Sequence, residues 1–124
     1  MSAIPFGAIV LTDFPFTDLT AAKRRPALVI STNNDRRTDI VIAYITSVLR
    51  NEPDSIPIAP APGTGLKVPS LVRFDKIATI DKNIISGRLG EAEPAWLADA
   101  RQVFLACSDL IRQNTECCPR KYIH

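Results

Sequence analysis

The side chains in this sequence that could do chemistry are arginines, one aspartate and a few hydroxyls. Arg73 and Asp75 stand two residues apart in "PSLVRFDKIATI", and Arg25 directly precedes Pro26. Guanidinium groups bind phosphate oxygens, and a carboxylate beside them could accept a proton. The residues alone leave a second interpretation open, in which Arg73 and Asp75 form an ordinary ion pair on a strand surface.

Other kinds of catalytic site find little support. The only histidine is His124, so serine–histidine and cysteine–histidine nucleophiles are not expected in the core. The "GTG" at 63–65 does not lead into a helix, which favours a turn over a phosphate-binding loop. Cys117, Cys118 and His124 lack the spacing of a zinc site, and we expect no metal ion and no cofactor.

The composition is that of one folded domain and says little about partners. The chain has 124 residues with 15 basic and 13 acidic side chains, so its net charge is only +2. The sequence shows no basic leader and no long apolar stretch, and its number of cysteines is odd. These three features favour a cytoplasmic protein. We expect one domain over residues 1–113 and a loose tail over 114–124, whose removal should leave folding and activity nearly intact.

Most of the chain has the pattern of short β-strands separated by turns. Runs rich in β-branched and aromatic residues predict strands over 7–14, 26–31, 40–48 and 69–80, with one further edge strand around 56–59. A long loop is expected over 14–25. The stretch 51–65 holds four prolines and is expected to be an exposed excursion. "KNIISGRLG" suggests a helical turn or a short strand.

One amphipathic helix is expected at the end of the chain, over residues 93–113. Pro94 suits its first turn, and its apolar residues recur at spacings of three and four. These residues are Leu97, Ala100, Phe104, Cys107 and Ile111. Trp96 and Val103 lie off this face and leave apolar surface that permits dimerisation. Short strands followed by one helix predict a mainly β fold, a curled antiparallel sheet or small barrel with the helix packed on it.

These elements would place the chemical residues near strand ends. Arg73 and Asp75 would share one strand face, about 6–7 Å apart along the chain. Proline biases the preceding residue to extended geometry, which would aim Arg25 out of its strand end. Thr46 and Ser47 would point to opposite faces, so we expect only Thr46 to face the site. Hydroxyls that cap a turn are the alternative for both.

Three segments in this order resemble the MazF/PemK (Kid-like) toxins of type II toxin–antitoxin systems. "FGAIVLTDFPFTDLTAAKRRPALVIS" resembles their Gly-led first strand, long loop and Arg-Pro dipeptide before an apolar strand. "YITSV" is similar to their third strand, which ends in a hydroxyl residue. "GLKVPSLVRFDKIATIDKNIISGRLG" is similar to the segment that carries a Ser or Thr, an Arg and an Asp. The likeness covers roughly residues 6–112.

The resemblance implies an SH3-like barrel of antiparallel strands with a C-terminal amphipathic helix, in a homodimer. It also implies a toxin that is a metal-independent, sequence-selective endoribonuclease, cleaving single-stranded RNA by 2′-OH attack to give 2′,3′-cyclic phosphate and 5′-OH ends. The implied partners are this RNA and a cognate antitoxin, with antitoxin-mediated contact to operator DNA and no membrane. An acidic antitoxin segment is expected to cover the basic groove.

By position, the resemblance assigns catalytic roles to Arg25, Thr46, Arg73 and Asp75. We expect RNA contacts from five further residues, of which Ser47 and Ser70 match family positions: Lys23, Arg24, Ser47, Ser70 and Lys76. The sequence departs from the family in three places, one of which is the proline-rich stretch 51–65, expected to reshape the RNA groove. Its first loop lacks the glycine and the histidine or glutamate seen in some members, and Lys76 stands where several members carry Gln.

The division of roles stays open at this point. Arginine barely deprotonates, so Arg25 and Arg73 should mainly stabilise the transition state. Asp75 is either the proton acceptor or the residue that orients Arg73. Two other functions also remain: a barrel that poisons DNA gyrase without catalysis, and an inactive family member that only regulates its operon with a partner.

Overall fold

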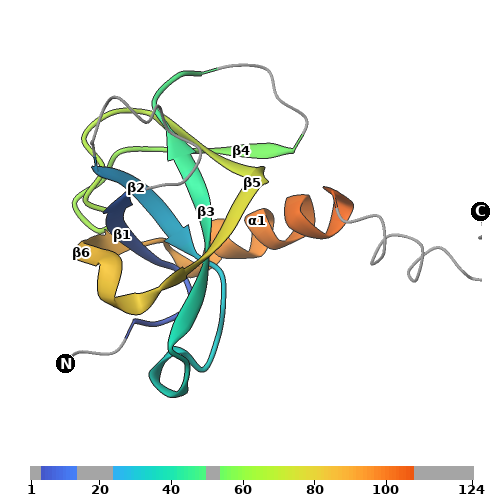
Figure 1. The fold of residues 1–124 in the computed structure, drawn as a ribbon. Helices are drawn as coiled ribbons and strands as arrows, with labels where there is room; N and C mark the ends of the chain where they lie inside the picture. Colours follow the sequence, from blue (N-terminus) through green and yellow to red (C-terminus); the bar gives the residue numbers. More distant parts are fainter. Residues whose placement is uncertain (1–3, 14–23, 50–53, 108–124) are drawn as a thin grey trace, which may run out of the picture.

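The computed structural model of the chain describes residues 4–13, 24–49 and 54–107. Within these ranges the strands are β1 (Ala8–Asp13), β2 (Arg24–Val29), β3 (Asp39–Thr46), β4 (Ser55–Ile58), β5 (Ser70–Asp81) and β6 (Ile85–Glu91). Two short 3-10 turns, η1 (Asn34–Arg36) and η2 (Lys82–Ile84), precede β3 and β6. One helix, α1 (Pro94–Cys107), follows the last strand (Figure 1).

The six strands form one antiparallel sheet in the order β4-β5-β3-β2-β1-β6. Figure 1 shows the sheet strongly curled, with the long β5 bending across it. The predicted fold class, mainly β with one C-terminal helix, is confirmed. The expected strands are all present, and β4 lies at a sheet edge, where its Pro57 costs no ladder hydrogen bond. The segment "KNIISGRLG" forms both a helical turn and a strand.

Alternating apolar residues of the strands fill two core clusters, one on each face of the sheet. The alternation follows from strand geometry, since neighbouring residues point to opposite faces. Ile9, Leu28 and Val72 belong to the cluster under α1, whereas Val10 and Val29 belong to the other. None of the described helical residues forms a span long and apolar enough to cross a bilayer.

Helix α1 packs on the first of these clusters, along β4 and β5. Ala100 is buried against the sheet. The rings of Phe104 and Phe74 meet edge to face, with their centroids 5.5 Å apart. Trp96 Nε1 donates a hydrogen bond to the Pro57 carbonyl oxygen at 2.8 Å, which ties the helix to the edge strand.

The buried stripe of α1 is wider than its periodicity predicted. Leu97, Phe104 and Cys107 pack on the core as expected. Trp96 and Val103 also pack on it, so the expectation that they are spare surface for a dimer is wrong. A helix lying against a curled sheet buries more than a narrow seam. The expected continuation to residue 113 and the tail with Cys117, Cys118 and His124 lie outside the described residues.

The stretch after β4 folds onto the sheet. Thr64 and Leu66 are buried, and Ala61 forms a β-bridge with Leu66. Gly65 N donates to Ala61 O at 3.0 Å, which closes a tight turn. The expectation of an exposed excursion over 51–65 is therefore wrong for its last residues. Leu66, the residue that follows, inserts into the core, and the turn before it packs against the sheet.

A buried asparagine closes the opposite end of the sheet, where β2 leads into β3. Asn34 Nδ2 donates to Ile4 O at 2.6 Å and to Ser31 O at 2.9 Å. Ser31 Oγ donates to Asn34 Oδ1 at 2.6 Å, and Lys82 Nζ donates to Asn34 O at 2.7 Å. These bonds join three separate parts of the chain, so this end is held together by polar contacts.

Candidate functional site

A small pocket opens at the end of the sheet where β2 begins, β3 ends and β5 begins. Its volume is about 280 Å³, and four residues predicted for the site line it: Arg25, Thr46, Ser47 and Ser70. They come from β2, from the end of β3 and the residue after it, and from the start of β5. The fold therefore brings together hydroxyls and a cation from three separate segments.

Arg25 is the strand-borne cation of this pocket. It is the second residue of β2, opposite Thr12 of β1, and it is half-buried. Its Nε atom is buried and has no hydrogen-bond partner among the described residues. Such a donor is costly, because it has lost water without gaining an acceptor. An oxygen atom of a bound anion would satisfy it.

The hydroxyl groups of the pocket have different hydrogen-bonding roles. Thr46 Oγ1 accepts from Val48 N at 3.1 Å, so its O–H can still donate toward the pocket. Ser70 is buried and donates its O–H to Val68 O at 3.0 Å. The expectation that only Thr46 would face the site is wrong. Ser47 lines the pocket as well, because β3 ends at Thr46 and strand alternation does not extend to Ser47.

Arg73 and Asp75 form a bidentate ion pair on the neighbouring part of β5. Arg73 Nε donates to Asp75 Oδ1 at 3.1 Å, and Nη2 donates to Oδ2 at 2.7 Å. The Arg73 hydrogen bond lowers the pKa of the Asp75 carboxyl below its ordinary 3.8, partial burial opposes this, and the Arg73 charge adds to the lowering. Asp75 is therefore ionised at neutral pH, with both oxygens occupied by Arg73.

The pairing of β5 with β3 is irregular beside the Arg73–Asp75 ion pair. Tyr44 pairs with Arg73, but its neighbour Ala43 pairs with Ile77, so residues 74–76 fall outside the regular ladder. An irregular stretch of this kind re-aims side chains. Phe74 turns into the core, while Asp75 stays exposed and Lys76 is half-buried.

Arg73 and Asp75 do not line the Arg25 pocket, yet Arg73 shares a sheet face with Arg25. Ala27, two residues after Arg25, pairs with Tyr44, which pairs with Arg73. Paired residues of antiparallel strands point to one face, and so do residues two apart. Two strand spacings separate β2 from β5, roughly 10 Å. An extended polyanion lying across this face could contact both arginines.

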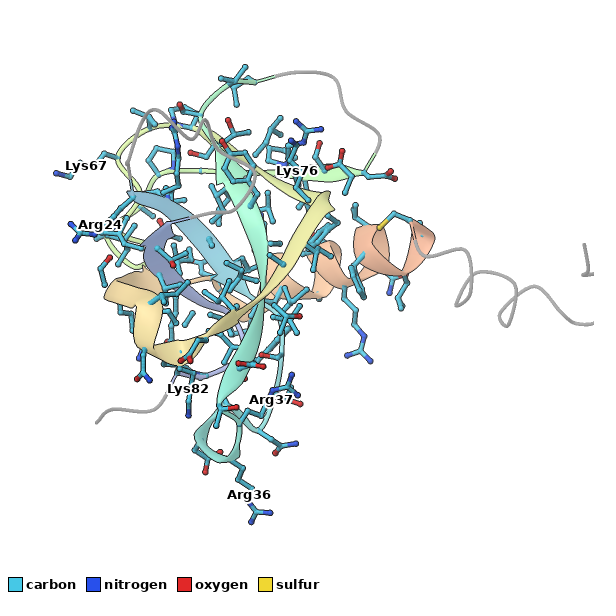
Figure 2. The ribbon with its side chains drawn as sticks, viewed as in Figure 1. Arg24, Arg36, Arg37, Lys67, Lys76 and Lys82 are labelled. Atoms are coloured by element: carbon cyan, nitrogen blue, oxygen red, sulfur yellow. The ribbon has the colours of Figure 1, made fainter. Side chains whose placement is uncertain are left out.

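The basic run between residues 23 and 37 is divided between two ends of the molecule. Arg24 is exposed at the start of β2, next to Arg25. Figure 2 shows Arg24 and Lys67 on one side of the molecule, and Arg36 and Arg37 at the far end. Lys23 and most of the first loop lie outside the described residues. Only part of the basic run can therefore serve the pocket.

Sequence reasoning missed one wall of the pocket. This wall consists of four residues of the β4–β5 loop and one of β6: Gly65, Leu66, Lys67, Val68 and Leu89. The only sequence signal was a glycine pair followed by a cation in "GTGLK". That signal says nothing about β6, since the loop meets β6 through a tertiary contact between distant segments.

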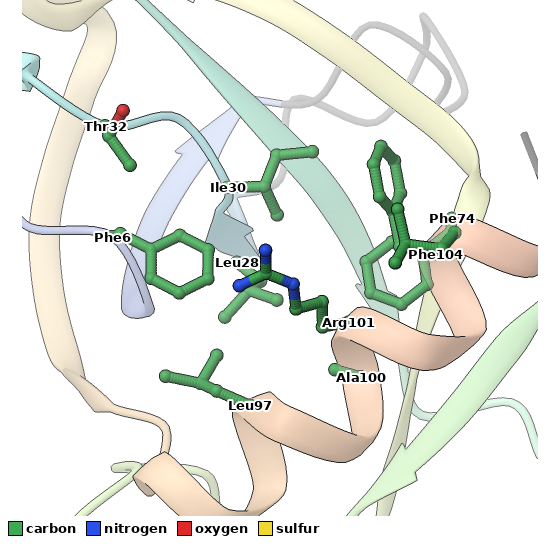
Figure 3. A pocket seen from close by; sticks show the side chains of 10 residues that line it. Phe6, Leu28, Ile30, Thr32, Phe74, Leu97, Ala100, Arg101 and Phe104 are labelled. Carbon is green, nitrogen blue, oxygen red and sulfur yellow. The ribbon is translucent and has the colours of Figure 1, made fainter. Parts of the chain in front are cut away.

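A larger, mostly apolar cavity of about 400 Å³ lies between α1 and the sheet. Figure 3 shows Leu28 of β2 and Leu97 of α1 among the side chains that line it. Among the described residues its lining includes one charged side chain, Arg101, and no residue predicted for the site. We place the candidate site at the smaller pocket, because polar groups able to act on a substrate converge there.

Comparisons with known proteins agree with this fold. A sequence model of PemK-like, MazF-like toxins of type II toxin–antitoxin systems matches residues 6–106. No curated protein matches the chain. A solved MazF from Deinococcus radiodurans is 25% identical, with a TM-score of 0.68, and the match covers 86% of this chain and 96% of that one.

Two solved mycobacterial proteins are similar to a comparable degree. An endoribonuclease from a mycobacterial species is 25% identical over 86% of this chain and 91% of that one, with a TM-score of 0.67. A second mycobacterial endoribonuclease, solved in complex with its cognate antitoxin, is 24% identical over 84% of this chain and 93% of that one, with a TM-score of 0.69.

Proposed function

The chain belongs to the PemK-like, MazF-like toxin family of type II toxin–antitoxin systems, and from this premise we propose that it is a toxin that cleaves single-stranded RNA. Solved proteins of similar fold are described as endoribonucleases, one of them with its antitoxin. The proposed cleavage needs no metal ion.

The observation that carries this proposal is the environment of Arg25. Its buried Nε lacks an acceptor among the described residues, and Thr46 beside it can donate a hydroxyl proton. Fixed donors around a small volume suit a tetrahedral anion such as a phosphodiester. RNA supplies that group together with its own nucleophile, the neighbouring 2′-hydroxyl.

In the proposed reaction the 2′-oxygen attacks the adjacent phosphorus and the bond to the 5′-oxygen breaks. The 2′-hydroxyl gives its proton to solvent water and the leaving 5′-oxygen takes one from solvent water, which gives 2′,3′-cyclic phosphate and 5′-hydroxyl ends. Arg25 stabilises the charge that develops on the phosphate oxygens, and Thr46 provides a second donor. Donors already in place at the start of the reaction need no reorganisation in the transition state.

Arg73 contributes a second guanidinium on the same face, and Asp75 orients it. Of the two roles open for Asp75, orientation is favoured over proton acceptance. Both of its oxygens accept hydrogen bonds from Arg73, and its lowered pKa makes it a weak base. Five further residues are proposed to contact the RNA: Lys23, Arg24, Ser47, Ser70 and Lys76.

The proposed partners follow from the same surface. A cognate antitoxin neutralises the toxin by laying an acidic segment over the cationic pocket and excluding RNA from it. A homodimer would repeat the pocket twice on one particle, so that a long RNA could meet two cleavage sites.

Incubation of the purified protein with a long single-stranded RNA in excess EDTA tests the proposal. We expect discrete fragments with 5′-hydroxyl ends. Arg25→Ala should lower kcat about 10²–10³-fold, the range found when one transition-state donor is removed. Arg73→Ala should also abolish efficient cleavage.

Arg36→Ala is the matched control for these variants. Arg36 is an exposed cation at the opposite end of the molecule, so its loss should leave cleavage unchanged. Intact RNA with inhibited DNA supercoiling would instead identify a gyrase poison. Intact RNA with normal gyrase would leave a regulatory protein without catalysis.

A further inference from the structure

The β4–β5 loop lies against the backbone of β6 at a contact that only glycines permit. Glu91 N donates to Gly63 O at 2.9 Å. A Cβ atom on Gly90 would collide with Gly63 O, and a Cβ atom on Gly65 would collide with the Leu89 carbonyl. Gly65 also has a φ of 76°, in the region that favours glycine. We call this contact between residues 63–65 and 89–91 the glycine clasp.

The clasp and its neighbours fix the backbone on both sides of Lys67. Before it, Leu66 is buried in the core, and its N–H donates to the Thr64 hydroxyl at 3.2 Å. After it, buried Ser70 donates its hydroxyl to Val68 O at 3.0 Å. Lys67 itself is exposed and makes no ion pair within the described part of the chain. An exposed cationic side chain therefore stands on a backbone that is held on both sides.

We propose that Lys67 binds a second RNA phosphate, next to the one held by Arg25, and that the glycine clasp positions it. This inference rests on the proposed function. Arg25 and Lys67 are the charged residues of the described pocket lining, and both are cations. Two like charges around about 280 Å³ repel each other, and a bound polyanion relieves this repulsion.

The chemistry of the two cations assigns them different tasks. Arginine holds phosphate oxygens with a planar fork of fixed donors, which suits the phosphate that reacts. Lysine is a point charge on a flexible stem, which suits a neighbouring phosphate that only has to be held. Lys67 therefore contributes to RNA affinity, whereas Arg25 contributes to the chemical step.

Lys67→Ala is the first test, on an oligoribonucleotide with one mapped cleavage site. We expect KM to rise about five- to tenfold while kcat stays within about twofold. The affinity for the same oligonucleotide carrying a 2′-deoxy sugar at the cleaved position should fall equally. The salt dependence of that affinity should lose about one phosphate contact. Lys67→Arg keeps the cation and should restore most of the affinity.

Arg36→Ala again controls for the loss of one positive charge. Equal KM values for Lys67→Ala and Arg36→Ala, or an unchanged salt dependence, would overturn the Lys67 subsite while leaving wild-type cleavage intact. If the wild-type protein leaves RNA intact, the proposed function and this inference both fail. A fall in kcat without a change in affinity would also overturn it.

The role of the clasp is tested by Gly90→Ala, alone and combined with Lys67→Ala. If the clasp acts by placing Lys67, Gly90→Ala alone should raise KM, and it should add little once Lys67 is gone. If the effects of the two changes on KM were additive, this would contradict the proposal that the glycine clasp positions Lys67. A thermal melt of each variant shows that the compared proteins are folded.

Discussion

Asp75 accepts two hydrogen bonds from Arg73, at 3.1 and 2.7 Å, and this pairing decides what the carboxylate can do. A carboxylate whose pKa is lowered by its partner is a poorer base than a free one. The other charged groups of the proposed site, Arg25, Arg73 and Lys67, are all cations. Catalysis by this set rests on holding charge in place.

Asp75→Asn gives a pH test of this assignment. The folded pKa of Asp75 lies below 3.8, so the ion pair stabilises the protein above about pH 4 and is lost as pH falls through the folded pKa. The stability difference between wild type and Asp75→Asn should therefore be constant from about pH 8 to 5 and shrink below about pH 4. Chemical denaturation at several pH values measures it.

The same variant should be slower in cleavage at every pH, with RNA binding affected much less. Asp99→Asn, which removes an exposed carboxylate on α1, controls for the change in net charge. An acid limb in the wild-type rate between about pH 5 and 7 that disappears in Asp75→Asn would show that this carboxyl accepts the proton after all.

At the scale of elements, the positions of the strands follow from local sequence, but their irregularities do not. β-Branched runs bounded by prolines and glycines predict β1, β2 and β3. The β3–β5 ladder breaks at residues 74–76, and within this stretch Phe74 packs against Phe104 of α1. That contact joins distant segments, so alternation within "VRFDK" could not reveal it.

A prediction about these elements concerns the hydrogen bond that joins α1 to the edge strand β4. Trp96→Phe removes the Nε1–H donor to Pro57 O while keeping an aromatic ring. We expect the free energy of unfolding to fall by about 1–2 kcal/mol, from one lost hydrogen bond and a smaller ring. RNA cleavage should be unchanged, because the site residues come from other strands.

Urea denaturation followed by circular dichroism measures this loss. Gln102→Ala, at an exposed position of the same helix, is the control and should change stability by under about 0.5 kcal/mol. A Trp96→Phe variant as stable as the control would mean that the hydrogen bond to β4 does not hold the helix in place.

For the whole molecule, the sequence supports the fold class and the strand-end position of Arg25 and Thr46. Both depend on local features, a proline after Arg25 and a β-rich run before Thr46. The pocket as a whole could not be predicted. Its second wall depends on the approach of the β4–β5 loop to Leu89, which the close contacts of Gly65 and Gly90 permit.

Several exposed apolar side chains bear on the oligomeric state. Within the described ranges, Phe6 is 45% exposed, Leu49 58% and Ile84 49%. Covering such side chains favours self-association. In sedimentation velocity we expect a species of twice the 13.6 kDa chain mass, dissociating on dilution. A single monomeric species at every concentration would refute the proposed homodimer. The rate of RNA cleavage per chain, measured at low protein concentration, would then show whether a single pocket is enough for activity.

The Asn34 network offers a practical opportunity. Its side-chain donors and acceptor are taken up by Ile4 and Ser31, at the end of the sheet remote from Arg25. The adjoining residues Thr32 and Thr38 are exposed. A fluorophore or surface tether attached there would report on single cleavage events without obstructing the substrate's path.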